Sequence, residues 1–167
     1  MTYTLSDSIR THLDKWLQRY PKDQKCSGVF EALRLVQEEN QGHLTLEMMN
    51  AVADYLEMPY IAVYEIATFY TMYHLEPVGR HVINVCSNIS CMLNGADHII
   101  DHLKNRLGIN LSETTADGQF TLKEVECLGA CIAPPVCLIG KEFYEHLTPQ
   151  KIDDIIARKA REAENGK

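Results

Sequence analysis

Cysteine is the residue type with the most chemistry to offer in this sequence of 167 residues, and four of its cysteines form two close pairs. Cys86 and Cys91 are separated by a spacer of four residues. Cys127 and Cys131 are separated by a spacer of three. Thiolates that are paired in this way bind soft or borderline metals, so a zinc ion and an iron–sulfur cluster are the first candidates.

The spacing favours a [2Fe-2S] cluster and leaves zinc open. Zinc usually takes closely spaced cysteine pairs on tight turns. A two-iron cluster is wider than a single ion and tolerates more open loops. Leu128, Gly129 and Ala130 lie between the second pair, and small residues there let backbone N–H groups approach the sulfides. A Rieske-type centre is excluded because neither cysteine loop contains a histidine.

Two other uses of the thiols are less well supported. A disulfide framework is a poor explanation, because a chain of this length can bury a core without staples. The first ten residues also lack the apolar segment of an export signal, so we expect a cytoplasmic protein. A thiol–disulfide oxidoreductase is disfavoured because no Cys-x-x-Cys pair is present.

Both cysteine pairs follow predicted strands, His81–Cys86 and 120–126, in the second half of the chain. If these strands are neighbours in one sheet, their loops leave the same edge and the four sulfurs can converge. Between the strands we predict a helix with Asn94 as its N-cap, closed by Gly108. The prediction continues with strands at 136–139 and 142–144, a last helix with Thr148 as N-cap and Pro149 first, and a polar tail from Arg161.

Residues 1–78 are predicted to form a small bundle of four short amphipathic helices, since none can bury its apolar stripe alone. Ser27 and Thr45 are the expected N-caps of the second and third helices, and the fourth follows Pro59. The element order after residue 79 is β-α-β-β-α. The fold class is therefore a helical bundle followed by a compact α/β domain.

Composition excludes several classes of function. Apolar residues make up 46% of the chain and charged residues 23%, as in ordinary globular proteins. The net charge is −7 without any basic cluster, which argues against nucleic acid and against an anionic membrane surface. The apolar runs are only a few residues long, so no membrane helix is expected.

Three segments carry a family resemblance: PYIAVYEIATFYTMYHLEPVGRH at 59–81, HVINVCSNISCMLNG at 81–95 and VECLGACIAPPV at 125–136. Together they resemble the family of the E subunit of NADH-quinone oxidoreductase (respiratory complex I), whose members are thioredoxin-like [2Fe-2S] ferredoxins. The resemblance runs from about Ser27 to the last helix. It implies a helical region over 1–78 and a thioredoxin-like [2Fe-2S] ferredoxin domain over 79–160, followed by the tail at 161–167.

The resemblance also implies a ligand set and a function. The family's motif places one [2Fe-2S] cluster on Cys86, Cys91, Cys127 and Cys131. Many members have Pro before the second cysteine, where this chain has Ser90. The implied function is that of an electron-transfer subunit, which would not catalyse a reaction by itself. Its cluster would accept electrons from a flavin and would lie to the side of the main electron path to quinone.

The implied partner is the subunit that binds FMN and NADH, because this chain has no glycine-rich dinucleotide loop. Other peripheral-arm subunits are further partners, on the cytoplasmic face of the inner membrane. Two alternatives remain open. One is the equivalent diaphorase subunit of an NAD-linked hydrogenase or formate dehydrogenase, and the other is a structural zinc-binding interaction module.

The remaining cysteines and histidines have simpler interpretations. Cys137 lies in an apolar run and is predicted to be a core residue, while Cys26 has no cysteine near it and is predicted to be inert. His98 and His102 fall opposite the apolar stripe of their helix, so we expect a solvated face and not a metal site.

Aromatic residues concentrate at 55–73, where they can pack between the two parts of the chain or form a partner surface. Pro134-Pro135 lies beside the second cysteine pair, at a corner where thioredoxin-like folds often keep a cis proline. The sequence does not decide which of the two roles the aromatic residues have, or whether the Pro134-Pro135 bond is cis or trans.

Overall fold

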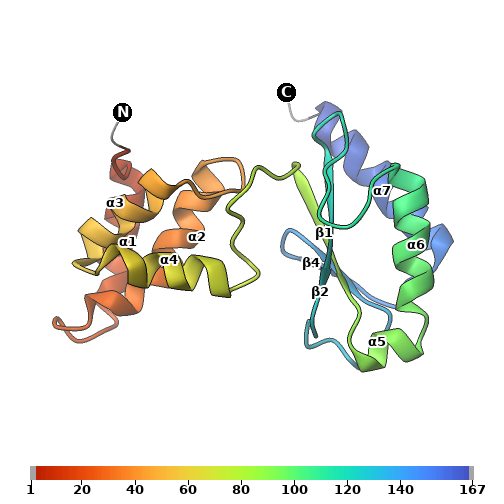
Figure 1. Cartoon of the computed structure of the whole chain (residues 1–167), viewed down its shortest axis with the longest axis horizontal. Helices are drawn as coiled ribbons and strands as arrows, with labels where there is room; N and C mark the ends of the chain where they lie inside the picture. The colour runs from red at the N-terminus through yellow and green to blue at the C-terminus, as the bar shows by residue number, and fades with distance from the viewer. Residues whose placement is uncertain (1–2, 166–167) are drawn as a thin grey trace. The chain divides into compact units, whose positions relative to one another are not determined.

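The chain folds as two units, Met1–Pro77 and Val78–Lys167, which the computed structural model describes over residues 3–165 (Figure 1). The first unit is helical and the second combines a sheet with helices. The mixture of bundle and α/β domain confirms the predicted fold class. The helical elements of the first unit are α1 (Asp7–Leu17), the 3-10 turn η1 (Lys25–Gly28), α2 (Val29–Glu39), α3 (Leu46–Leu56) and α4 (Tyr60–Phe69).

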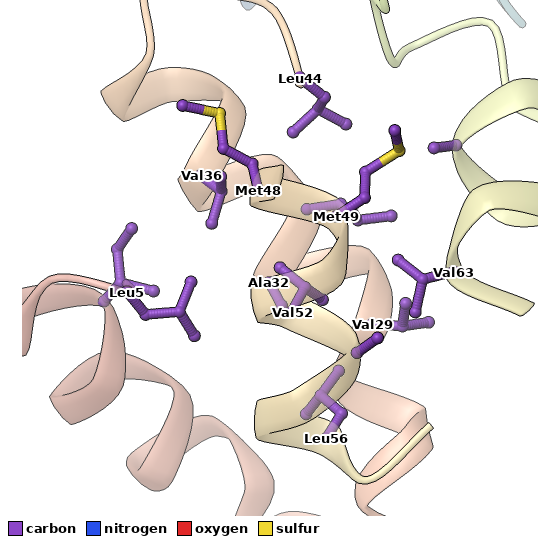
Figure 2. Close-up of a cluster of buried hydrophobic side chains, with 14 of the residues drawn as sticks. Leu5, Val29, Ala32, Val36, Leu44, Met48, Met49, Val52, Leu56 and Val63 are labelled. Carbon is purple, nitrogen blue, oxygen red and sulfur yellow. The ribbon is translucent and has the colours of Figure 1, made fainter. Parts of the chain in front are cut away.

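The helices of the first unit close around one apolar core. In Figure 2, Val29 and Ala32 of α2 face Met49 and Val52 of α3, and Val63 of α4 points toward them. These side chains follow helical spacing along each segment, which is why the amphipathic pattern in the sequence predicted the bundle. Thr45 caps α3 as predicted: its hydroxyl accepts a hydrogen bond from the Met48 N–H at 3.4 Å.

The start of α2 differs from the prediction. Ser27 is not its N-cap, because the 3-10 turn η1 runs directly into the helix and Gly28 occupies the cap position. The N–H of Val29 donates to the Cys26 carbonyl. A backbone carbonyl therefore accepts a hydrogen bond at the helix start that a serine hydroxyl was expected to accept. A Cβ at Gly28 would lie 2.8 Å from Leu17 Cδ2, so a larger residue here would have to displace the end of that side chain.

The second unit is a four-stranded mixed sheet in the order β2-β1-β3-β4, with helices packed on it. The central strand β1 runs parallel to β2 and antiparallel to β3, and β4 forms a hairpin with β3. The predicted strands agree within a residue at each end. The elements are β1 (His81–Cys86), α5 (Ile89–Leu93), α6 (Ala96–Leu107), β2 (Phe120–Val125), β3 (Cys137–Ile139), β4 (Glu142–Tyr144) and α7 (Pro149–Asn165).

Two helix boundaries in this unit correct the sequence analysis. Asn94 is not the N-cap of α6; Gly95, with φ +88°, takes that place without a side-chain bond. Asn94 instead ends the short helix α5, where its amide donates to the Ser90 carbonyl at 2.8 Å. At the other end of the domain, α7 continues to Asn165, through residues that were predicted to form a polar tail.

The extension of α7 has a local cause. Lys159 and Glu162 form an i,i+3 ion pair at 3.0 Å, and the added residues are mostly good helix formers. Thr148 caps the start of α7 as predicted, accepting from the Lys151 N–H at 3.2 Å. Residues 166–167 of the predicted tail lie outside the described part of the chain.

Candidate metal centre

The parallel pairing of β1 and β2 sends both cysteine loops off the same edge of the sheet. Cys86, the last residue of β1, is in register with Val125, the last residue of β2. Cys127 follows two residues later, and Cys91 lies on α5 immediately after β1. The structure therefore brings together the two loops that the sequence analysis placed side by side.

The first cysteine pair is buried. Cys86 and Cys91 pack with Ala96 and Val136 in a small apolar cluster of their own. The backbone N–H of Cys86 donates to the Val136 carbonyl at 3.1 Å, which ties the end of β1 to the segment before β3. Burial, together with a hydrogen bond to Cys86, raises the pKa of the Cys91 thiol to about 11.

The second pair is exposed, although its two sulfur atoms lie 3.2 Å apart. The N–H of Gly129 donates to Cys127 Sγ at 3.4 Å and lowers the pKa of that thiol. Gly129 has φ +79°, a backbone conformation that glycine adopts without strain, so the chain can turn tightly here. The turn therefore supplies the backbone donor that the small residues in this spacer led us to expect.

Hydrogen bonds hold the two loops together. The Asn88 side chain caps α5 by accepting from the Ile89 N–H at 3.0 Å, and its amide donates to the Glu126 carboxylate at 2.7 Å. The Ser90 hydroxyl donates to the Cys131 carbonyl at 3.4 Å. The bonds to Glu126 and to Cys131 join the first loop to the second, so the spacing of the two cysteine pairs is fixed by the protein.

Sequence reasoning missed α5 and the role of Asn88. An asparagine directly before the short apolar run at 89–93 is a helix-start signal that could have found both. The run is shorter than the window over which helical periodicity is recognisable, which is why periodicity does not reveal it.

The donor set fits a two-iron cluster better than one zinc ion. Four cysteine thiolates hold a [2Fe-2S] cluster, two on each iron, and the sulfurs here are arranged as two pairs, one buried and one exposed. Zinc needs all four donors around a single ion. Among the side chains that the structure describes, no three of Cys, His, Asp or Glu are grouped around one point.

Both cysteine loops carry exposed apolar side chains. Ile132 is 92% exposed and follows Cys131 directly, while Leu93 on α5 is 76% exposed. Ile89 and Met92, on the same short helix, are exposed as well. The second loop then turns through the Pro134-Pro135 bond, which is cis, the isomer that the sequence had left open.

The other residues considered from the sequence lie elsewhere. Cys137 is fully buried in the sheet core, where burial raises the pKa of its thiol to about 12, so its prediction as a core residue is confirmed. Cys26 is exposed in the helical unit. The expectation of a solvated face is wrong for His102, because its Nε2 lies 3.1 Å from Asp153 Oδ1 on α7.

A small mixed sheet with four cysteines in two loops at one edge is the fold and site of an iron–sulfur electron carrier. The family model of the thioredoxin-like [2Fe-2S] ferredoxins matches residues 13–160, and the chain belongs to that family. The resemblance inferred from the sequence is thereby confirmed, and the cofactor that the family carries is a [2Fe-2S] cluster.

Named relatives agree with this assignment. The chain is 46% identical to the E subunit of NADH-quinone oxidoreductase from Rickettsia bellii over 140 residues, 84% of each chain. In Rhizobium meliloti, the E subunit numbered 2 of the same enzyme is 40% identical over 149 residues, 89% of this chain and 87% of that one.

A solved structure shares the fold. An NAD+-reducing [NiFe]-hydrogenase in the air-oxidized state superposes with a TM-score of 0.67 at 19% sequence identity. The match covers 81% of this chain and 23% of the hydrogenase chain. In the part of the chain that the structure describes, no helix has the length and apolar character needed to cross a membrane.

Proposed function

We propose that this chain is the [2Fe-2S] electron-transfer subunit of an NADH-quinone oxidoreductase, with Cys86, Cys91, Cys127 and Cys131 as the cluster ligands. The observation that carries the proposal is the convergence of two cysteine pairs on one sheet edge, in a chain whose relatives bear the name of that enzyme's E subunit. When bound, the cluster supplies a one-electron redox centre.

The residues of this chain have separate tasks at the centre. Cys86 and Cys91 hold their side of the site out of water, since both are buried beside Val136. The Gly129 N–H presents a hydrogen bond to sulfur, which stabilises the thiolate of Cys127. Burial and sulfur hydrogen bonds are the two levers by which a protein sets the potential of such a centre.

The proposed partner is the flavin- and NADH-binding subunit of the same complex, together with other peripheral-arm subunits. The chain lacks a glycine-rich dinucleotide loop of its own, so NADH chemistry belongs to another subunit. Ile132 and Leu93, exposed on the two cysteine loops, offer an apolar contact surface close in sequence to the proposed ligands. The proposed location is the cytoplasmic face of the inner membrane, through the complex.

Spectroscopy of the anaerobically purified full chain tests the cluster. A brown protein with a rhombic EPR signal after one-electron reduction is expected, and stoichiometric zinc without visible absorbance would overturn the proposal. Serine at any one of the four proposed ligands should abolish or severely weaken the spectrum. Cys26→Ser is the matched control and should leave it intact.

Co-purification from native membranes tests the parent enzyme. An NADH-oxidising flavoprotein with quinone reductase activity is expected in the same complex. Recovery with a hydrogenase or formate dehydrogenase would instead support the diaphorase alternative. Recovery of the chain only as a free ferredoxin would count against both.

A further inference from the structure

The helix α4 is apolar on the side that the helical unit leaves uncovered. Val63 and Ala67 are buried and face the core, as Figure 2 shows for Val63. On the opposite side, Ile61 is 62% exposed and Phe69 is 77% exposed. A helix that is apolar all round is normally covered on every side, so this side of α4 is a candidate contact surface.

The exposed side chains form two adjacent rows along the helix. One row is Tyr60, Tyr64 and Thr68, and the other is Ile61, Glu65 and Phe69. We call these six residues the α4 face. All are exposed, and four of the six are large apolar or aromatic residues.

Two of the four polar side chains of the α4 face are hydrogen-bonded within the chain. The Tyr60 hydroxyl donates to Asp54 Oδ1 at 2.8 Å. The Thr68 hydroxyl donates to the Tyr64 carbonyl at 2.9 Å, within the same helix. The Tyr64 hydroxyl and the Glu65 carboxylate make no hydrogen bond or ion pair with any residue of the described chain, and only Glu65 carries a charge.

The end of the α4 face is held in place by other aromatic rings. Phe69 packs edge-on against Tyr70 with ring centroids 5.0 Å apart, and Tyr70 packs edge-on against Phe30 of α2 at 4.8 Å. An exposed aromatic ring that is fixed before binding loses little side-chain entropy on contact. Rings of this kind are typical anchors of protein interfaces.

The stretch of sequence that contains the α4 face carries negative charge only. Residues 35–79 contain no lysine or arginine, and all six basic residues of the helical unit precede position 35. The same stretch contains seven acidic residues: Glu38, Glu39, Glu47, Asp54, Glu57, Glu65 and Glu76. Two of them are paired with basic residues from the preceding part of the chain, Glu38 with Arg34 and Glu57 with Lys25. A second copy of this chain would bring a second acidic stretch against the first, which disfavours a symmetric dimer.

From these observations we infer that the α4 face docks into an apolar groove of a different protein, and that this groove carries a lysine or arginine paired with Glu65. A carboxylate in the middle of an apolar surface is costly to cover unless a cation meets it. The same pairing gives the contact its specificity. The inference concerns the helical unit and does not depend on the cluster or its ligands.

Site-specific photo-crosslinking of the full chain in its native host tests this inference. A benzophenone amino acid is placed at Ile61 or Phe69, and after irradiation the cross-linked peptides are identified by mass spectrometry. Support requires a peptide from another protein in which lysine or arginine lies beside the apolar residues. A second copy of this chain, residues 78–167 of the same chain, lipid, a partner peptide without a basic residue, or no cross-link would each overturn it.

A charge reversal tests the role of Glu65. Glu65→Lys should reduce the cross-link from Phe69 by about tenfold or more, because it places two cations together at the contact. Asp101→Lys, an exposed acidic position on α6, is the matched control and should leave the yield unchanged. Far-UV circular dichroism and the visible spectrum of the cluster should be the same in both variants. Equal yields from the two variants would refute the pairing.

Discussion

Replacement of Asn88 by alanine is the sharpest test of how the two cysteine loops are held. The change removes the side-chain cap of α5, which carries Cys91, at a cost of about 1 kcal/mol. It also removes the 2.7 Å hydrogen bond to the Glu126 carboxylate, which contributes about 1 kcal/mol at this exposed position. Together these losses amount to about 2 kcal/mol. A loss of this size raises the equilibrium population of the opened loop about 30-fold.

The assay for this prediction is the rate of cluster loss to an excess of iron chelator, followed anaerobically by visible absorbance. If loop opening precedes iron loss, Asn88→Ala should lose its cluster about 10- to 30-fold faster than the parent chain. Glu126→Ala keeps the helix cap at Asn88 but removes the acceptor of its amide, so its rate should be intermediate.

Asn105→Ala is the control, since it removes an exposed asparagine from the surface of α6. Its rate of cluster loss should equal that of the parent chain. Equal rates for Asn88→Ala and Asn105→Ala would refute the reasoning, because Asn88 would then not determine how the loops open.

Three further perturbations have definite expected outcomes. Gly129→Ala should cost about 1 kcal/mol through backbone strain alone, because φ is +79° and no atom lies within 4 Å of an added Cβ; thermal unfolding measures it. Cys137→Ser should keep the cluster spectrum but lower the unfolding free energy by about 1–3 kcal/mol, because it buries a hydroxyl in the apolar core; a bleached protein would contradict the ligand set. Hydrogen bonds from Arg34 and His12 hold the pKa of Glu31 below its ordinary value of 4.5, so this stabilisation is complete above that pH and is lost as pH falls further. Denaturant titrations at neutral and acidic pH should therefore show a smaller acid-induced loss for Glu31→Gln than for the parent chain.

The positions of the strands and of the cysteine pairs could be predicted because they depend on local patterns. The helical periodicity ends before the turn at Pro77, and the residues rich in β-formers that follow it located β1. Parallel neighbours then follow from the helix between them, and the convergence of the loops follows from the parallel pairing. The resemblance to a family added the cofactor.

The details of the site could not be predicted because they depend on distant residues. The two cysteine pairs look alike in sequence, yet Val136 and Ala96 bury the first pair and leave the second exposed. The pairing of Asn88 with Glu126 joins residues 38 positions apart. Two predicted N-caps, Ser27 and Asn94, were wrong for a related reason. The 3-10 turn η1 leads directly into α2, and Gly95 occupies the N-cap position of α6.

The division of the buried side chains between the two units has a consequence for denaturation. The core of the helices lies entirely before Pro77, and the apolar clusters of the sheet lie entirely after it, among the residues described. Unfolding need not be a single cooperative event, so one melting temperature would average two transitions. Removal of the metal should lower only the transition that belongs to the sheet. A calorimetric trace with one peak moving and one peak fixed is the expected signature.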